Sequence, residues 1–187
     1  MFGDVSFSRP MIDGVYRWQM YVNGMDVPSW EPRDDAVQRG YIGFNDGFQA
    51  GIRRLFKVDD KVVKMDVPGY NDVPQAFMEA RVWGLLDEDD KPFFAECLGA
   101  FHAPGVDTGG DSCEVAYCVQ PRADDLLPSR EASPDMSRKV ADLWEKYKLS
   151  DSASRQWKIR ESTGLPFIHD YGISYKLEAE MTKDQFE

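Results

Sequence analysis

The segment Arg33–Phe56 constrains the fold most strongly, because it combines a helical apolar period with four glycines. On a helical wheel these glycines form one narrow stripe with aromatic residues beside it. The candidate interface residues are Gly40, Gly43, Gly47, Gly51, Tyr41, Phe44 and Phe48. Four interior glycines cost roughly 3–4 kcal/mol of helix stability relative to alanines. We therefore expect another backbone to pack closely on the stripe, either from this chain's own sheet or from a neighbouring subunit.

A hairpin is the alternative for the same segment. Asp46-Gly47 is a turn signal, and it could join Tyr41–Phe44 to Phe48–Ile52. We favour the helix because the helical period holds over the longer window. Pro32 also suits a first helical turn, where its missing N–H costs nothing.

Turn signals divide most of the remaining chain into short strands. The expected strands are Gly14–Val22, Lys61–Val67, Ser112–Gln120, a short one within Ser154–Arg160, and Tyr171–Met181. Asn23-Gly24 predicts a hairpin turn after the first of them. Ser133-Pro134 predicts the start of a helix, with a capping serine followed by a first-turn proline. The chain as a whole predicts one α+β domain over 1–187, with a mostly antiparallel sheet and two main helices at about 33–56 and 134–149.

A second hairpin is predicted from Phe77–Leu86 and Phe93–Phe101, with Asp87–Pro92 as its turn. Four consecutive acids, from Asp87 to Asp90, indicate an exposed tip. A calcium loop is the alternative, but Pro92 and Leu98 occupy positions where that pattern requires glycine and glutamate. We expect replacement of Asp89 and Asp90 to leave stability nearly unchanged.

The charge balance excludes several partners. The 187 residues carry a net charge of −11, and the pI is about 4.7. Such a surface repels nucleic-acid phosphates and anionic membranes and accepts a basic protein partner. Three cysteines give no disulfide framework, and no signal peptide or membrane span is recognisable. We expect a soluble protein of the reducing cytoplasm that can be incorporated into a particle.

Val106-Asp107-Thr108-Gly109 is the stretch that resembles a catalytic signature, that of aspartic proteases. The signature requires an apolar strand before the aspartate, and Pro104-Gly105 is expected to interrupt that strand. We interpret Ala103–Asp111 as a glycine-rich loop with Asp107 as a turn residue.

Other catalytic and metal-binding patterns are weak. Cys97, His102, Cys113 and Cys118 lack a zinc-site spacing, and buried packing is the favoured role of the cysteines. His169-Asp170 could form an oriented base, but no nucleophile is evident, so we favour a loop histidine. Phosphate- and dinucleotide-binding glycine patterns are absent. The sequence therefore predicts no catalytic residues, no metal and no cofactor.

These observations favour a non-enzymatic protein–protein interaction protein, a structural subunit of a larger assembly such as a viral (phage) particle. The alternatives are an acidic inhibitor or immunity-type protein that caps a basic surface, and a hydrolase that uses Asp107 or His169. The partners are other subunits of the assembly or a protein target, and a homo-oligomer is compatible with this. The end segments MFGDVSFSRP and MTKDQFE are weak strand and helix formers. We expect neighbouring subunits to hold them, so that removal of Met1–Pro10 or of Thr182–Glu187 weakens assembly more than folding.

Overall fold

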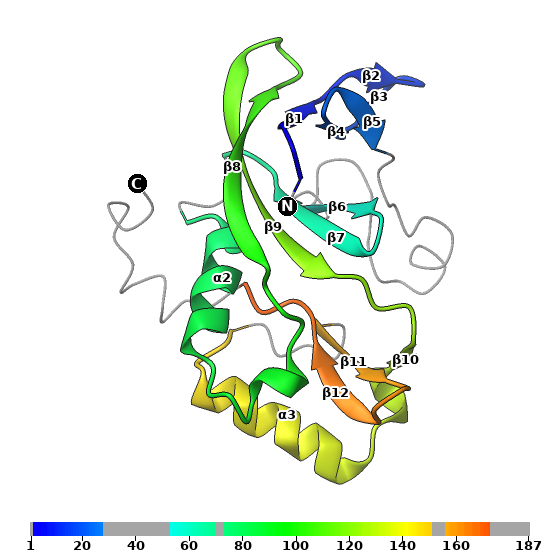
Figure 1. The fold of residues 1–187 in the computed structure, drawn as a ribbon, viewed down its shortest axis with the longest axis vertical. Coiled ribbons are helices and arrows are strands. Elements are labelled where there is room, and N and C mark those ends of the chain that lie inside the picture. Colours follow the sequence, from blue (N-terminus) through cyan, green and yellow to red (C-terminus); the bar gives the residue numbers. More distant parts are fainter. Residues whose placement is uncertain (1, 28–52, 70–72, 151–155, 173–187) are drawn as a thin grey trace.

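The computed structural model describes residues 2–27, 53–69, 73–150 and 156–172, and its fold is α+β, as the sequence predicts (Figure 1). The strands are β1 (Val5–Ser8), β2 (Met11–Ile12), β3 (Val15–Tyr16), β4 (Gln19–Val22), β5 (Met25–Val27), β6 (Arg53–Val58), β7 (Lys61–Asp66), β8 (Gly99–Val106), β9 (Ser112–Pro121), β10 (Leu126–Pro128), β11 (Trp157–Arg160) and β12 (Leu165–Ile168). The helices are α2 (Gln75–Leu85) and α3 (Pro134–Lys146), with 3-10 turns η1 (Lys91–Phe93) and η2 (Ser129–Glu131).

Seven strands form the main sheet, in the order β5-β4-β1-β8-β9-β7-β6. Within it β1 and β8 run parallel, with Phe7 opposite Gly105, and the other neighbours are antiparallel. Strands β10, β11 and β12 make a separate three-stranded sheet, and β2 and β3 make a two-stranded one. The antiparallel prediction therefore holds, with β1–β8 as the exception.

The main sheet curls so that its two edges approach each other. Its edge strands β5 and β6 lie close together, and the ring of Phe7 on β1 reaches Phe56 on β6 at 5.9 Å between centroids. Phe7 also contacts Tyr117 on β9 at 5.8 Å. The concave face is apolar because alternate residues of each strand point inward. The buried side chains on it include Val5, Phe7, Met20, Phe56, Val63, Met65, Val115, Tyr117 and Val119.

Helix α2 covers the convex face, against β7, β8 and β9 (Figure 1). Its other side packs on a second core, which α3 and the small sheet complete. The buried residues of this second core include Met78, Val82, Leu143, Trp144, Trp157, Ile159, Ile168 and Tyr171. Helix α2 is thus a layer between two packed bodies, and it is apolar on more than one side.

Several predicted elements are confirmed. Strand β9 turns Val115, Tyr117 and Val119 to one face, and β7 does the same with Val63 and Met65. Asn23-Gly24 forms the turn between β4 and β5, with both residues at positive φ. Ser133 caps the start of helix α3, and its side chain accepts a hydrogen bond from the Met136 N–H.

The predicted hairpin of Phe77–Leu86 and Phe93–Phe101 is wrong. The first arm is helix α2, and β8 begins at Gly99 and pairs with β1 and β9. Because α2 is buried on two sides, its apolar residues do not form a single stripe at the helical period. Their spacing therefore resembled the alternation expected of a strand. The predicted loop Ala103–Asp111 is also wrong over its first half, since β8 continues through Pro104-Gly105 to Val106.

The predicted helix Arg33–Phe56 lies mostly outside the described residues. Its last four residues, Arg53–Phe56, are described, and they belong to strand β6, so the helix is wrong there. The predicted strand Gly14–Val22 is divided into β3 and β4. Of the final strand Tyr171–Met181, only Tyr171 and Gly172 are described.

The N-terminal strand is interior to the sheet. Strand β1 lies between β4 and β8 and pairs with both. Its own sheet therefore holds the segment around Val5–Ser8, and no neighbouring subunit is needed for that. Removal of residues 1–10 is expected to disrupt folding, in contrast to the expectation drawn from the sequence.

The aromatic contact across the concave face gives a stability prediction. We expect Phe7→Ala to lower the free energy of unfolding by about 3–5 kcal/mol, because it opens a cavity beside Phe56 and Tyr117. Urea denaturation monitored by circular dichroism measures the change. Met11→Ala is the control, since Met11 is 58% exposed, and it should change the value by no more than about 0.5 kcal/mol. Equal effects in the two variants would contradict the curled arrangement.

Candidate functional site

A buried carboxylate joins α2 to the main sheet. Glu79 has no solvent exposure, and its Oε1 accepts hydrogen bonds from Arg53 Nη1 at 2.8 Å and Lys64 Nζ at 2.9 Å. Its Oε2 accepts from the Cys118 thiol at 2.9 Å, and more weakly from Arg53 Nη2 and from Gln120 Nε2 at 3.3 Å. A carboxylate offers about four lone-pair sites. The donors around Glu79 therefore use its full capacity.

Asp66 and the C-terminal part of the described chain complete this group. Asp66 Oδ1 lies 2.9 Å from Arg53 Nε, and its Oδ2 accepts the Ala76 N–H at 2.7 Å in the first turn of α2. Lys64 also donates to the His169 carbonyl oxygen. We call Arg53, Lys64, Asp66, Glu79, Cys118 and Gln120 the Glu79 cluster.

The pKa shifts follow from this geometry. Burial alone would raise the pKa of Glu79, but the charges of Arg53 and Lys64 outweigh it and lower the value to about 2. Burial raises the pKa of the Cys118 thiol well above its usual value, which agrees with its role as a donor to Glu79. Glu79 is therefore an ionised anchor, and its oxygens have no lone pair left for a substrate.

A second buried carboxylate, Asp90, holds the loop after α2 against α3. Asp90 is 5% exposed, and its Oδ2 accepts from Lys146 Nζ at 2.6 Å and the Tyr147 hydroxyl at 2.8 Å. Its Oδ1 lies 3.2 Å from Lys139 Nζ. The prediction that the whole Asp87–Asp90 run is an exposed tip is therefore wrong for Asp90. It holds for Asp87, Glu88 and Asp89, which are exposed.

Asp107 is a turn residue in the β8–β9 connection. Its Oδ1 accepts the N–H groups of Gly109 at 2.8 Å and Asp111 at 3.0 Å, so the carboxylate closes its own turn. The reason given from the sequence was wrong, because the strand runs up to Val106 without interruption at Pro104-Gly105.

The other titratable candidates are dispersed. Burial and, second to it, the charge of the nearby Lys64 lower the pKa of His169 to about 4, so its imidazole is neutral at pH 7. His102 stacks on Phe77 at 4.6 Å and lies 3.1 Å from Glu114. Cys97 and Cys118 are buried, whereas Cys113 is partly exposed. Across the described ranges, no three His, Cys, Asp or Glu side chains are grouped so that they could hold a metal ion.

The predicted interface residues lie outside the described part of the chain. All seven, Gly40, Gly43, Gly47, Gly51, Tyr41, Phe44 and Phe48, fall within residues 28–52. The glycine-stripe hypothesis stays a prediction.

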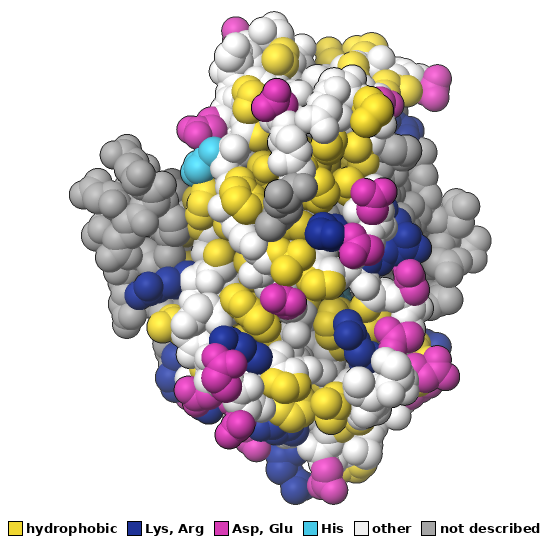
Figure 2. Space-filling view, in the orientation of Figure 1, with side chains coloured by type: hydrophobic (Ala, Val, Ile, Leu, Met, Phe, Trp, Pro, Cys, Tyr) yellow, Lys and Arg dark blue, Asp and Glu magenta, His cyan; other side chains and the backbone are white. Residues whose placement is uncertain are grey.

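The described residues present a different candidate surface at the β2–β5 end of the molecule. Met11 is 58% exposed, Tyr16 45% and Met25 67%, and Met11 lies opposite Tyr16 across β2 and β3. Val106 is exposed next to the same end, since it lies opposite Ser8 of β1. We call Met11, Tyr16, Met25 and Val106 the N-terminal surface. Figure 2 shows hydrophobic side chains at this end of the molecule, as well as over the middle of the same face.

Acidic residues outnumber basic ones in the segments that carry the N-terminal surface. The described segments 2–27 and 99–114 contain six acids, Asp4, Asp13, Asp26, Asp107, Asp111 and Glu114, and two arginines, Arg9 and Arg17. Arg9 lies over the Trp18 ring at 5.7 Å, and both arginines are partly buried. In Figure 2 most Lys and Arg side chains lie over the middle and lower parts of the molecule. This end therefore combines exposed apolar groups with a negative rim.

Neither protein-family models nor curated proteins match this sequence. In the described parts of the chain, no helix has the length and apolar character that a bilayer span requires.

Sequence reasoning missed both buried carboxylates and the N-terminal surface. Lys64 and Asp66 alternate with Val63 and Met65, a pattern that normally indicates a solvated strand face, whereas here α2 covers that face. For Asp90, the signal was available in the apolar residues that follow it, since Pro92-Phe93-Phe94 would bury the end of an acidic run.

We expect Glu79→Gln to lower the free energy of unfolding by roughly 3–5 kcal/mol, because Arg53 and Lys64 would stay buried without their shared counter-charge. Urea denaturation at pH 7 measures this. Glu161→Gln is the matched control at an exposed position and should change stability by no more than about 0.5 kcal/mol. Retention of full stability in Glu79→Gln would show that the cluster does not anchor α2.

Asp90 gives a prediction that depends on pH. The hydrogen bond from Lys146 lowers the pKa of Asp90 to about 2, from 3.8. A carboxyl with a lowered pKa stabilises the fold above its unfolded-state pKa, and that contribution is lost as pH falls from about 4 to 2. We expect Asp90→Asn to cost about 2 kcal/mol at pH 7 and to flatten the loss of stability between pH 4 and 2. Asp89→Asn is the control, because Asp89 is exposed, and its stability should vary with pH as that of the native protein does. If the two variants gave the same dependence of stability on pH, the structural role assigned to Asp90 would be contradicted.

Proposed function

We propose that this protein is a non-enzymatic interaction protein that works as a structural subunit of a larger assembly, of the kind found in viral particles, and binds its partner through the N-terminal surface. The observation that supports this is the exposure of Met11, Tyr16 and Met25 on short strands at one end of the molecule. Exposed apolar groups with a polar rim are typical of protein–protein contacts. Methionine side chains adapt readily to a partner's surface.

The rim defines the partner's chemistry. Asp13 and Asp26 are exposed beside the apolar side chains, so a partner with apolar recesses and Lys or Arg around them is complementary. Two copies of this surface would repel each other, and a different protein chain is therefore the preferred partner. The cytoplasm and the assembled particle are the proposed locations.

The buried carboxylates fit this proposal. Glu79 and Asp90 are each occupied by donors from the same chain, and Asp107 binds backbone N–H groups of its own turn. These acids have structural roles that need no substrate. They fix the rigid body that presents the N-terminal surface.

The test uses the full chain with an affinity tag, produced in its native source. We expect the double variant Met11→Asp/Met25→Asp to weaken partner association at least tenfold, because two apolar anchors become charged. Leu85→Asp is the control, since Leu85 is 47% exposed at the end of α2. Co-purification followed by light scattering measures association, and thermal melting confirms that each variant folds.

The outcomes separate the two binding functions. A structural subunit should co-purify in a multi-copy assembly, and its association should weaken at high salt because the rim is charged. A one-to-one complex with a basic target, whose activity the protein blocks, would favour the inhibitor. Unchanged association in the double variant, or a lone monomer in the native source, would contradict the proposal.

A further inference from the structure

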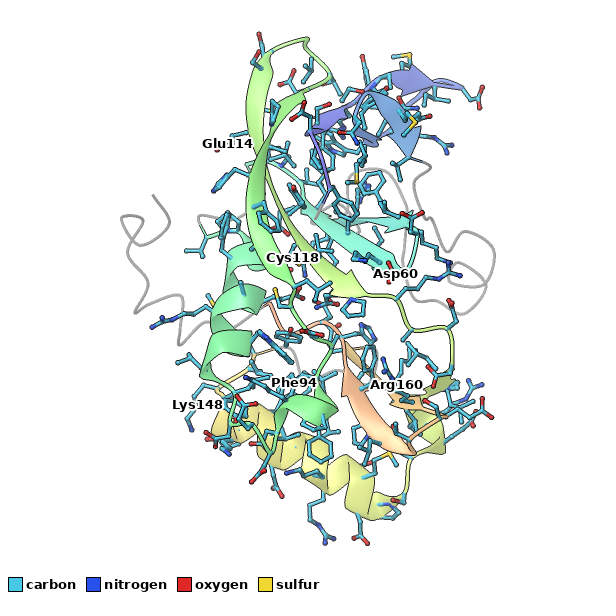
Figure 3. The ribbon with its side chains drawn as sticks, viewed as in Figure 1. Asp60, Phe94, Glu114, Cys118, Lys148 and Arg160 are labelled. Atoms are coloured by element: carbon cyan, nitrogen blue, oxygen red, sulfur yellow. The ribbon has the colours of Figure 1, made fainter. Side chains whose placement is uncertain are left out.

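A groove lies in the lower half of the molecule, between the end of α2, the loop that follows it and the small sheet. Its volume is about 490 Å³, within the range of small-ligand sites. Trp83, Phe94, Phe167 and Pro121 contribute to its walls. Figure 3 labels Phe94 and Arg160, two of its residues. Pro92 and four charged residues, Glu88, Lys91, Glu96 and Arg160, complete the lining, so the groove combines flat apolar groups with charges of both signs.

The two cations of the groove differ in their pairing. Lys91 Nζ lies 2.5 Å from Glu88 Oε1 and 5.5 Å from the centre of the Trp83 ring, so its charge is matched within the protein. Within the described ranges, the carboxylate oxygen that pairs with Arg160 is Asp125 Oδ1, at 4.0 Å from Nε. Arg160 Nε is buried and has no hydrogen-bond acceptor among the described residues, so a ligand in the groove would approach the terminal nitrogens of the guanidinium.

Asp125 is committed elsewhere. Its Oδ2 accepts the Ser162 N–H at 3.1 Å and the Ser162 hydroxyl, and these bonds lower its pKa. The carboxylate is thus held by the turn after β11, and it supports Arg160 from a distance without closing a hydrogen bond to it. Arg160 is therefore the less closely paired of the two groove cations, because its carboxylate partner lies at 4.0 Å and that of Lys91 at 2.5 Å.

Stacking fixes the orientation of Arg160. Its Cζ lies 4.4 Å from the centre of the Phe167 ring, and the side chain is 33% exposed. A guanidinium stacked on an aromatic ring is held in one plane and offers parallel N–H donors, which match the two oxygens of a carboxylate. Because the plane is already fixed, binding loses less side-chain entropy.

We propose that this groove binds a single carboxylate carried on an apolar body. The carboxylate pairs with Arg160, and the body lies against Phe94, Phe167 and Pro121. Glu96 also lines the groove and is exposed, so a ligand with a second negative charge, such as a phosphate, is disfavoured. The carboxylate can come from a free apolar acid or from the end of a peptide. This site is separate from the N-terminal surface and does not depend on the proposed function.

The test is an NMR titration of the isotope-labelled full chain with 3-phenylpropionate and with its neutral amide, 3-phenylpropanamide. We expect the acid to bind with a Kd on the order of 1 mM and the amide at least tenfold more weakly. N-acetylphenylalanine is the peptide-like probe. Tighter binding of N-acetylphenylalanine would indicate a peptide end as the source of the carboxylate, and tighter binding of 3-phenylpropionate would indicate a free apolar acid. This comparison needs no variant, so it stands even where a substitution harms folding.

Two arginine variants locate the site. Arg160→Gln should weaken binding of the acid at least tenfold, and Arg160→Lys should weaken it several-fold, because the charge stays but the paired donors are lost. Arg122→Gln is the control with the same charge change, since Arg122 pairs with Asp124 at 2.7 Å and is not a lining residue. Equal binding of acid and amide, absence of binding by either acid, or native affinity in a folded Arg160→Gln variant would overturn the proposal.

Discussion

The arrangement of the described chain depends on one buried charge, the carboxylate of Glu79. Helix α2 lies between the main sheet and the lower core, and an apolar helix in that position could slide or rotate over the small side chains beneath it. Glu79 prevents this because Arg53 on β6, Lys64 on β7 and Cys118 on β9 all point at the same two oxygens. Burying a group of ions costs desolvation free energy, and removing one partner afterwards destabilises the fold even more, because a charge is left buried without compensation. Its contribution is therefore to specify one position of the helix.

The same group couples segments that are distant in the sequence. Lys64 binds the His169 carbonyl oxygen, and Arg53 lies 3.4 Å from Asp170. Gly172 then passes so close to α2 that an added Cβ would lie 2.8 Å from the Gln75 carbonyl oxygen. The segment 169–172 is thus fixed by backbone and charge contacts around α2. The side of this helix that faces the main sheet, and the chain that crosses it, depend on the same few polar atoms.

Much of the fold was predictable from local pattern, and the failures share a physical cause. Strands β7 and β9 and helix α3 each have one clearly apolar face, so their periodicity was sufficient. Helix α2 is buried on two sides and carries Glu79 on its inner face, which hides the helical period. Asp90 was misread because a run of acids is usually solvated, whereas Lys139, Lys146 and Tyr147 are distant in sequence and come together only through α3. Tertiary pairing of charges leaves no local signal.

The position of β1 has a consequence for how the chain is synthesised. Phe7 pairs across the sheet with Gly105, so β1 cannot gain its parallel neighbour until β8 has been made. At 5–20 residues per second, that delay is roughly 5–20 s. During this interval β1 has only its local hairpin partner β4, and its apolar side chains lack the concave face that later buries them. Non-local parallel pairing is intrinsically slow. Until β8 has been synthesised, the apolar side chains of β1 are therefore available for aggregation or for binding by a chaperone.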